Sequence, residues 1–147
     1  MSLALYYHTL RYLKPRQFVE RVRFALQRPR PDVSAAPRRR RVAAAFPLQA
    51  LRQVSLLDQS VFRFLNVTRA LVRAEDWNDP GADRLWLYNL HYFDDLNATG
   101  REHRPAWHKQ LIARWMAENP PGFGTGWEPY PLSLRIVNWI KWACSGF

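Results

Sequence analysis

The chain has little cysteine and few acidic residues, and both shortages restrict its chemistry. Cys144 is the one cysteine in 147 residues, so neither an internal disulfide nor a cysteine-based metal site can form. His8, His103 and His108 show no metal-ligand spacing with carboxylates, so the sequence predicts no metal and no cofactor. The sequence contains no run of about 18 apolar residues, so it predicts no membrane span. Residues 1–13 show no evident secretory signal, because they lack a basic start.

Basic residues are abundant, and they concentrate near the N-terminus. The chain carries 22 Lys and Arg against 12 Asp and Glu, a net charge of +10. Residues 1–41 hold eleven of the basic residues and two of the acidic ones, which leaves +9 there and +1 in the remainder. The run of four arginines at 38–41 can attract nucleic acid, an anionic membrane surface or a polyanionic glycan. The alternative is a solvated loop, which the surrounding prolines support.

Periodicity predicts a mainly all-α chain in three parts. Residues 1–27 read as N-terminal helices, residues 28–47 as a Pro/Arg-rich linker, and residues 48–147 as a helical domain. Within that domain, partial alternation predicts a short strand near 61–66. The expected helices cover residues 84–97, 105–118 and 130–144.

The last of these helices has two distinct faces at helical spacing. One face is apolar and is expected to pack against a core: Leu132, Ile136, Ile140 and Ala143. The other joins a planar cation and an amide to two indoles: Arg135, Asn138, Trp139 and Trp142. Such groups suit an acidic sugar, because indole faces cover its C–H side and arginine binds a carboxylate in bidentate fashion. The alternative is a helix buried on nearly all sides, with Arg135 and Asn138 satisfied inside.

Three stretches of the chain carry a resemblance to a known family. They are residues 5–15 (LYYHTLRYLKP), 85–93 (LWLYNLHYF) and 126–142 (GWEPYPLSLRIVNWIKW). Together they resemble the N-terminal part of bacterial heparinase II/III-type polysaccharide lyases. The resemblance implies the start of an incomplete α/α toroid, a periplasmic setting and cleavage of acidic polysaccharide by β-elimination. It also implies that the catalytic asparagine, tyrosine and histidine follow the helix that contains Trp142, so we expect a truncated toroid without catalytic residues.

The middle stretch contains the residue types of lyase chemistry, but their spacing argues against a joint catalytic role. Asn89 and His91 are two positions apart on a helix and point about 200° from each other. His91 and Tyr92 are kept as a catalytic alternative. We expect instead that Trp86, Leu90 and Phe93 pack inward while Asn89 or Tyr92 reaches a groove.

The leading hypothesis is that this chain contributes substrate binding to a lyase acting on uronate-containing polysaccharide. The expected groove residues are Trp127, Tyr130, Arg135, Asn138 and Trp139. Glu128 is expected to orient Arg135 or a backbone amide. Acidic polysaccharide is the expected partner, together with downstream lyase segments, and nucleic acid is not. The alternative is a non-catalytic module that binds anionic glycan or nucleic acid through the basic N-terminal arm, and a third hypothesis is a purely structural segment.

Overall fold

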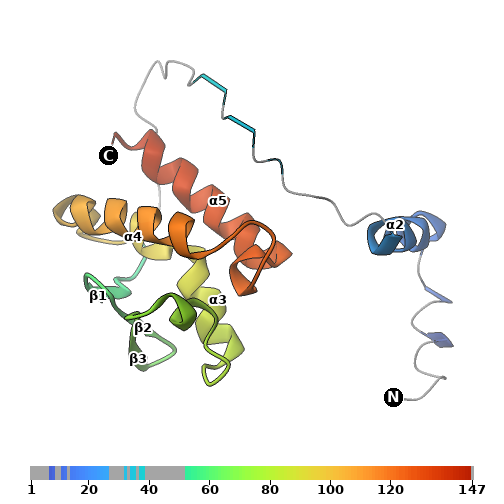
Figure 1. The fold of residues 1–147 in the computed structure, drawn as a ribbon, viewed down its shortest axis with the longest axis horizontal. Helices are drawn as coiled ribbons and strands as arrows, with labels where there is room; N and C mark the ends of the chain where they lie inside the picture. Colours follow the sequence, from blue (N-terminus) through green and yellow to red (C-terminus); the bar gives the residue numbers. More distant parts are fainter. Residues whose placement is uncertain are drawn as a thin grey trace. The chain divides into compact units, whose positions relative to one another are not determined.

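The computed structural model describes residues 7–8, 11–12, 14–26, 32, 34–35, 37–38 and 52–146 (Figure 1). The chain divides into two compact units, Met1–Ala35 and Ala36–Phe147, and each is described by itself. The three predicted domain ranges stay predictions.

The first unit contains helix α2, which spans Pro15–Leu26. Proline suits the first turn of a helix, since its missing N–H would have no partner there in any case. Just before the helix, the Lys14 backbone N–H donates to the Gln17 side chain at 2.9 Å. The predicted helix start at Pro15 is therefore confirmed.

The second unit begins with a small antiparallel sheet of three strands in the order β1-β2-β3. The strands are β1 (Leu56–Asp58), β2 (Val61–Phe64) and β3 (Val67–Ala70). Leu65 and Asn66 both have positive φ angles and form the two-residue connection between β2 and β3. Along β2 the side chains alternate, so Phe62 is buried whereas Arg63 is exposed. The strand predicted near residues 61–66 is confirmed, within a larger sheet.

Helical elements make up most of the second unit. The α-helices are α3 (Arg84–Tyr92), α4 (Pro105–Glu118) and α5 (Pro129–Cys144), and the 3-10 helices are η1 (Ala74–Asn78), η2 (Asp94–Asn97), η3 (Arg101–His103) and η4 (Thr125–Trp127). The mainly helical class is confirmed. No helix in the described part of the chain has the length and apolarity needed to cross a membrane.

The helix predicted over residues 84–97 is broken at Phe93. Asp83 caps the start of α3 by accepting from Leu85 N at 2.8 Å and Trp86 N at 3.1 Å. At Phe93 the backbone turns left-handed, with φ 59° and ψ 35°, and η2 follows. The turn places the Phe93 ring among three indoles, of Trp77, Trp115 and Trp139. Tertiary packing of one aromatic ring thus overrides helical propensity, which is a weak local preference.

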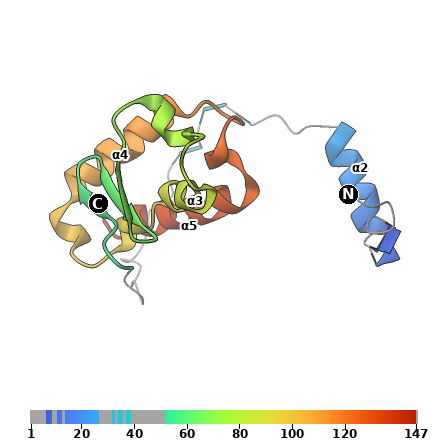
Figure 2. The same cartoon turned by 90° about the horizontal axis from the view of Figure 1, so that it is seen from below.

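The core of the second unit lies between the sheet and the helices. As predicted, Trp86, Leu90 and Phe93 are buried. The Trp86 ring packs edge-on against Phe64 of β2 at 5.3 Å and joins the sheet to α3. Figure 2 shows α3 beside α5, and the two helices pack directly against each other.

The prediction of which face of α5 is buried was wrong. Ile136 and Ile140 of the apolar stripe are exposed, at 47% and 57%, whereas Arg135 and Asn138 are 2% and 5% exposed. The polar and aromatic stripe of α5 therefore faces the interior. Its burial is possible because hydrogen-bond and aromatic partners on distant segments surround it, as described below.

Candidate functional site

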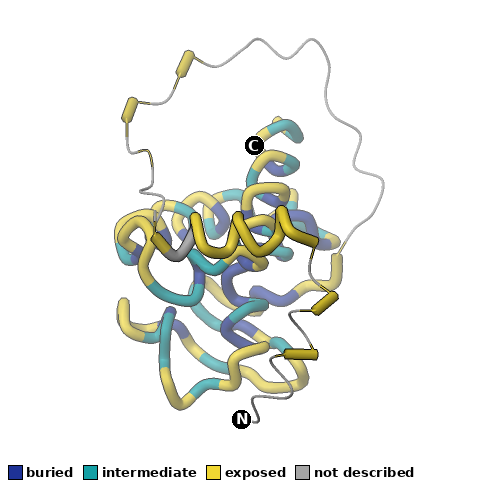
Figure 3. Tube along the Cα trace, turned by 90° about the vertical axis from the view of Figure 1, so that its right-hand side faces the viewer, coloured by how far each residue is buried: buried dark blue, intermediate teal, exposed yellow. Residues whose placement is uncertain are grey.

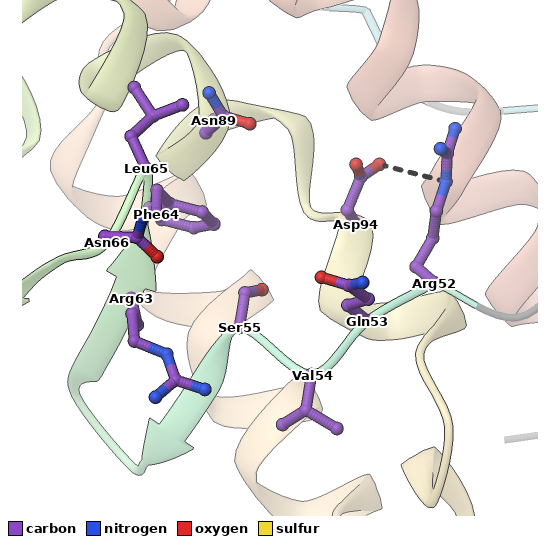
Figure 4. A pocket seen from close by; sticks show the side chains of 10 residues that line it. All are labelled: Arg52, Gln53, Val54, Ser55, Arg63, Phe64, Leu65, Asn66, Asn89 and Asp94. Carbon is purple, nitrogen blue, oxygen red and sulfur yellow. Dashed lines mark ion pairs between the residues drawn. The ribbon is translucent and has the colours of Figure 1, made fainter.

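A polar cavity lies between the segment that precedes β1, the β2–β3 hairpin and the end of α3 (Figure 4). Its volume is about 580 Å³, within the range of small-ligand sites. We call it the arginine cavity, because two guanidinium groups line it together with three amides and one carboxylate: Arg52, Arg63, Gln53, Asn66, Asn89 and Asp94. This lining favours a hydroxylated or anionic ligand over an apolar one.

Backbone pairing fixes the position of Arg52 at one side of the arginine cavity. Arg52 N donates to Asn97 O at 2.9 Å, and Thr99 N donates to Arg52 O at 3.0 Å. The Arg52 guanidinium lies 3.9 Å from Asp94 Oδ1, and this pair is partly exposed. On the opposite side, Figure 4 shows Arg63 and Asn66 on the β2–β3 hairpin. The segment around Arg52 and the β2–β3 hairpin, each held by backbone hydrogen bonds, therefore bound the cavity.

The arginine cavity has an excess of positive charge. Asp94 is shared, since its Oδ1 also accepts from Asn138 Nδ2 at 2.7 Å. Within residues 52–146, Arg63 has no carboxylate partner for its exposed guanidinium. Asn89 donates through Nδ2 to Leu85 O at 2.7 Å, which leaves its amide oxygen to accept from a ligand. An anion with adjacent hydroxyl groups would find both donors and acceptors here.

Arg135 occupies an aromatic box and not a surface groove. Its guanidinium carbon lies 3.8 Å from the ring centre of Trp115, 5.5 Å from that of Trp127 and 5.9 Å from that of Trp139. Nη1 donates to Gly126 O at 2.5 Å. Burial lowers the pKa of Arg135 to about 10. This is the alternative in which Arg135 is satisfied inside, and it gives the residue a packing role.

Asn138 links the helical layer to the arginine cavity. Its amide nitrogen donates to Tyr92 O at 2.8 Å and to Asp94, and its oxygen accepts from Asn97 Nδ2 at 3.1 Å. Both N–H donors of this buried amide and one lone pair of its oxygen are engaged by protein groups. Asn138 thus positions Asp94, which lines the arginine cavity, and does not line it itself.

The remaining predicted groove residues separate into two places. Trp127 and Trp139 are half-buried and form walls of the box around Arg135. Tyr130 is 60% exposed, and its ring meets the Tyr92 ring edge-on at 5.7 Å. The structure therefore brings Trp127, Arg135 and Trp139 together but places Tyr130 elsewhere. Contact of these residues with glycan stays a prediction.

Glu128 does not orient Arg135, contrary to expectation. Its carboxylate accepts from Arg84 Nη2 at 2.7 Å and from the Tyr88 hydroxyl. The hydrogen bond from Tyr88, followed by those from Arg84, keeps the Glu128 pKa below its ordinary value. The pairing ties the start of α5 to α3, which is a connection that spacing within one helix does not reveal.

His91 and Tyr92, the catalytic alternative, are both buried. His91 is 0% exposed, lies 2.9 Å from Trp77 O through Nε2, and accepts from Trp115 Nε1 at 3.0 Å through Nδ1. Burial lowers its pKa to about 4, so it is neutral near pH 7. Burial, followed by the neighbouring tyrosines, raises the pKa of Tyr92 to about 12. Both ring nitrogens of His91 are engaged by protein groups, and a catalytic role for His91 and Tyr92 stays a prediction.

A buried carboxylate behind the arginine cavity was missed by the sequence analysis. Asp95 Oδ1 accepts from Ser55 N at 2.8 Å and Leu56 N at 3.0 Å, and Oδ2 pairs with His108 Nε2 at 2.9 Å and Arg104 Nη2 at 3.2 Å. Burial opposes ionisation, but these hydrogen bonds outweigh it and lower the Asp95 pKa. Asp95 therefore holds the segment that carries Arg52 against η2. No local pattern indicates this contact, because its partners are 9 to 40 residues away.

Two further sequence-based questions involve residues outside these clusters. Arg38 is exposed, but Arg39, Arg40 and Arg41 lie outside the described residues, so binding through the basic arm stays a prediction. Within the described part of the chain, no group of three or more His, Cys, Asp or Glu side chains is placed to hold a metal ion.

No protein-family model, curated protein or solved structure matches this chain.

Proposed function

We propose that this chain binds acidic, uronate-containing polysaccharide in the arginine cavity, as the N-terminal toroid segment of a heparinase II/III-like lyase. The observation that carries the proposal is the Arg63 guanidinium, which has no carboxylate partner within residues 52–146 and lies across the cavity from Arg52. Arginine recognises carboxylate and sulfate groups through paired hydrogen bonds. The amides of Gln53, Asn66 and Asn89 would bind the sugar hydroxyls.

Two of the three stretches that resemble the lyases support this assignment. Asn89 belongs to the stretch 85–93 and lines the arginine cavity, while Asn138 belongs to the stretch 126–142 and binds Asp94 at its edge. Residues that carry the resemblance thus border or support the proposed site. The role proposed for this chain is binding, since the internal hydrogen bonds of His91 and the burial of Tyr92 disfavour proton transfer there.

The toroid is part of the proposal. In a toroid, helices stack in successive layers, and each layer covers the apolar face of the one before it. The exposed stripe of α5, which includes Ile136, Val137 and Ile140, suits such a neighbouring layer. The hydrogen bond from Asn138 Nδ2 to Tyr92 O fixes α5 against α3 within this layer.

Binding of the full chain to oligosaccharides of polygalacturonate or heparin, measured by calorimetry, tests the proposal, with neutral dextran as the comparison ligand. Arg63→Gln should weaken binding by about 10- to 100-fold, the equivalent of roughly 1.5–3 kcal/mol for a hydrogen bond to a charged group. Lys109→Gln removes the same charge from an exposed position of α4 outside the cavity and should change affinity less than about twofold.

Three outcomes would contradict the proposal. They are equal losses in the Arg63 and Lys109 variants, unchanged affinity in the Arg63 variant, or equal affinity for dextran. We also expect no ultraviolet absorbance from unsaturated uronate when the 147-residue chain is incubated with these glycans. Steady product formation that His91→Gln abolishes would restore the catalytic alternative.

A further inference from the structure

Helix α2 presents an apolar face that the described residues of its own unit leave uncovered. At 100° per residue, four of the five large apolar residues of α2 fall within an arc of about 100°. These four are exposed: Phe18 at 53%, Val19 at 59%, Val22 at 43% and Leu26 at 79%. Figure 3 shows α2 as exposed along its described length. A contiguous apolar patch of this kind on a helix marks an interaction surface.

Cations border this apolar face on both sides. Helical spacing places Arg21 about 60° from Phe18 at one edge and Arg23 about 40° from Val19 at the other. Residues 14–26 carry four basic residues and one acidic residue, Glu20, which leaves a net charge of +3. Arg23 lies 3.9 Å from Glu20 in an exposed pair, so the charge of that edge is reduced but remains positive because of Arg16.

We propose that α2 binds along an anionic membrane surface, with its apolar face at the boundary between headgroups and acyl chains. A planar anionic partner accounts for cations on both edges of one apolar face, whereas a protein groove is filled by a narrower stripe of anchors. The long stems of Arg16 and Arg21 let their guanidinium groups reach lipid phosphates while Phe18 and Val22 are buried. With twelve residues, α2 lies on the surface and does not span the bilayer.

This inference rests on residues that play no part in the arginine cavity, so the two proposals succeed or fail separately. The test is flotation of the full chain with phosphatidylcholine vesicles, with and without about one quarter phosphatidylglycerol. We expect binding to the anionic vesicles to be at least about fivefold stronger and to weaken with added salt. Phe18→Ser with Val22→Ser should lower binding at least about tenfold. Arg16→Gln with Arg21→Gln should lower it by roughly 25-fold, about fivefold for each charge.

The matched control changes two apolar residues of the second unit that are more exposed than Phe18 and Val22. Val72 and Phe123 are 73% and 68% exposed, and Val72→Ser with Phe123→Ser should leave flotation unchanged. All seven tryptophans lie in the second unit, so the tryptophan bands of the near-ultraviolet circular dichroism spectrum report its fold independently of α2. The spectrum should be the same in the α2 variants and the wild type.

Several results would overturn the proposal. The first is a failure of the wild-type chain to float with anionic vesicles, and the second is equal binding by the α2 variants and the control. A change in the near-ultraviolet spectrum of the Phe18/Val22 variant would show that the face packs against the second unit instead. A wild-type dimer that this variant converts to a monomer, measured by light scattering, would assign the face to a second copy of the chain.

Discussion

Replacing Arg135 by lysine is expected to destabilise the chain more than replacing it by methionine, although lysine keeps the charge. Burial lowers the Arg135 pKa from 12.5 to about 10, which corresponds to roughly 3 kcal/mol at 1.36 kcal/mol per pKa unit. Stacking in the indole box offsets about 2 kcal/mol of that cost. The hydrogen bond to Gly126 O offsets about 2 kcal/mol more.

The two substitutions remove different parts of this balance. Lysine retains the buried charge, but its compact, strongly hydrated ammonium cannot stack flat on Trp115 at 3.8 Å as guanidinium does. Arg135→Lys should therefore lower the free energy of unfolding by about 2–3 kcal/mol. Methionine removes the burial cost together with the two favourable contacts, so Arg135→Met should lower it by only about 1 kcal/mol.

Urea unfolding followed by tryptophan fluorescence measures the difference. With an m-value of about 1–3 kcal/mol/M, the lysine variant should shift the midpoint by roughly 1 M and the methionine variant by about half as much or less. A methionine variant that is as unstable as the lysine variant would refute the reasoning, because the charge itself would then be stabilising. A lysine variant with unchanged stability but weakened glycan binding would instead return Arg135 to the groove.

Two further predictions concern the contacts around the Arg135 box. Gly126→Ala should lower the free energy of unfolding by about 2–3 kcal/mol, because its Cβ would lie 2.6 Å from His91 Nδ1. Gly81→Ala should cost less than about 1 kcal/mol in the same urea titration, since its Cβ would lie 3.2 Å from the partly exposed Asp79 carboxylate, a milder contact, and equal losses would contradict the steric argument. Between pH 6.5 and 4, unfolded His91 binds a proton that the folded form, with its pKa of about 4, does not bind, so stability should fall with falling pH by up to about 3 kcal/mol. Urea midpoints across this range should show this pH dependence of stability in the wild type and in the control His103→Gln, whose side chain is exposed, but not in His91→Gln. An equal pH dependence in the His91 variant would assign the effect to other groups.

The local pattern was sufficient for several elements of the fold. Pro15 opens α2, the spacing of apolar residues places α4 at Pro105–Glu118, and partial alternation locates β2. These features depend on backbone preferences and periodicity within one segment, which the sequence contains directly. The inward packing of Trp86 and Leu90 followed from the same periodicity.

The candidate site could not be predicted in this way. Arg52, Arg63 and Asp94 come from three separate segments, which hydrogen bonds between distant residues hold together. Asp95 accepts from the backbone of Ser55 and Leu56, and the Arg52 backbone pairs with Asn97 and Thr99. The chemistry of Arg135 and Asn138 suits a sugar, and the sequence pattern therefore predicts them as groove residues. The same chemistry suits an interior that supplies a carbonyl, a carboxylate and indole rings, and the sequence does not show where those partners lie.

The sequence by itself determined that this is a mainly helical chain whose positive charge is concentrated before residue 42. Only the tertiary structure decided that α5 buries its polar and aromatic face and exposes Ile136 and Ile140. The physical reason is that a buried polar group is tolerated when its partners are in place. One partner of each lies on a distant segment: Trp115 is 20 residues from Arg135, and Tyr92 O is 46 residues from Asn138. Periodicity within the helix therefore could not distinguish the two faces.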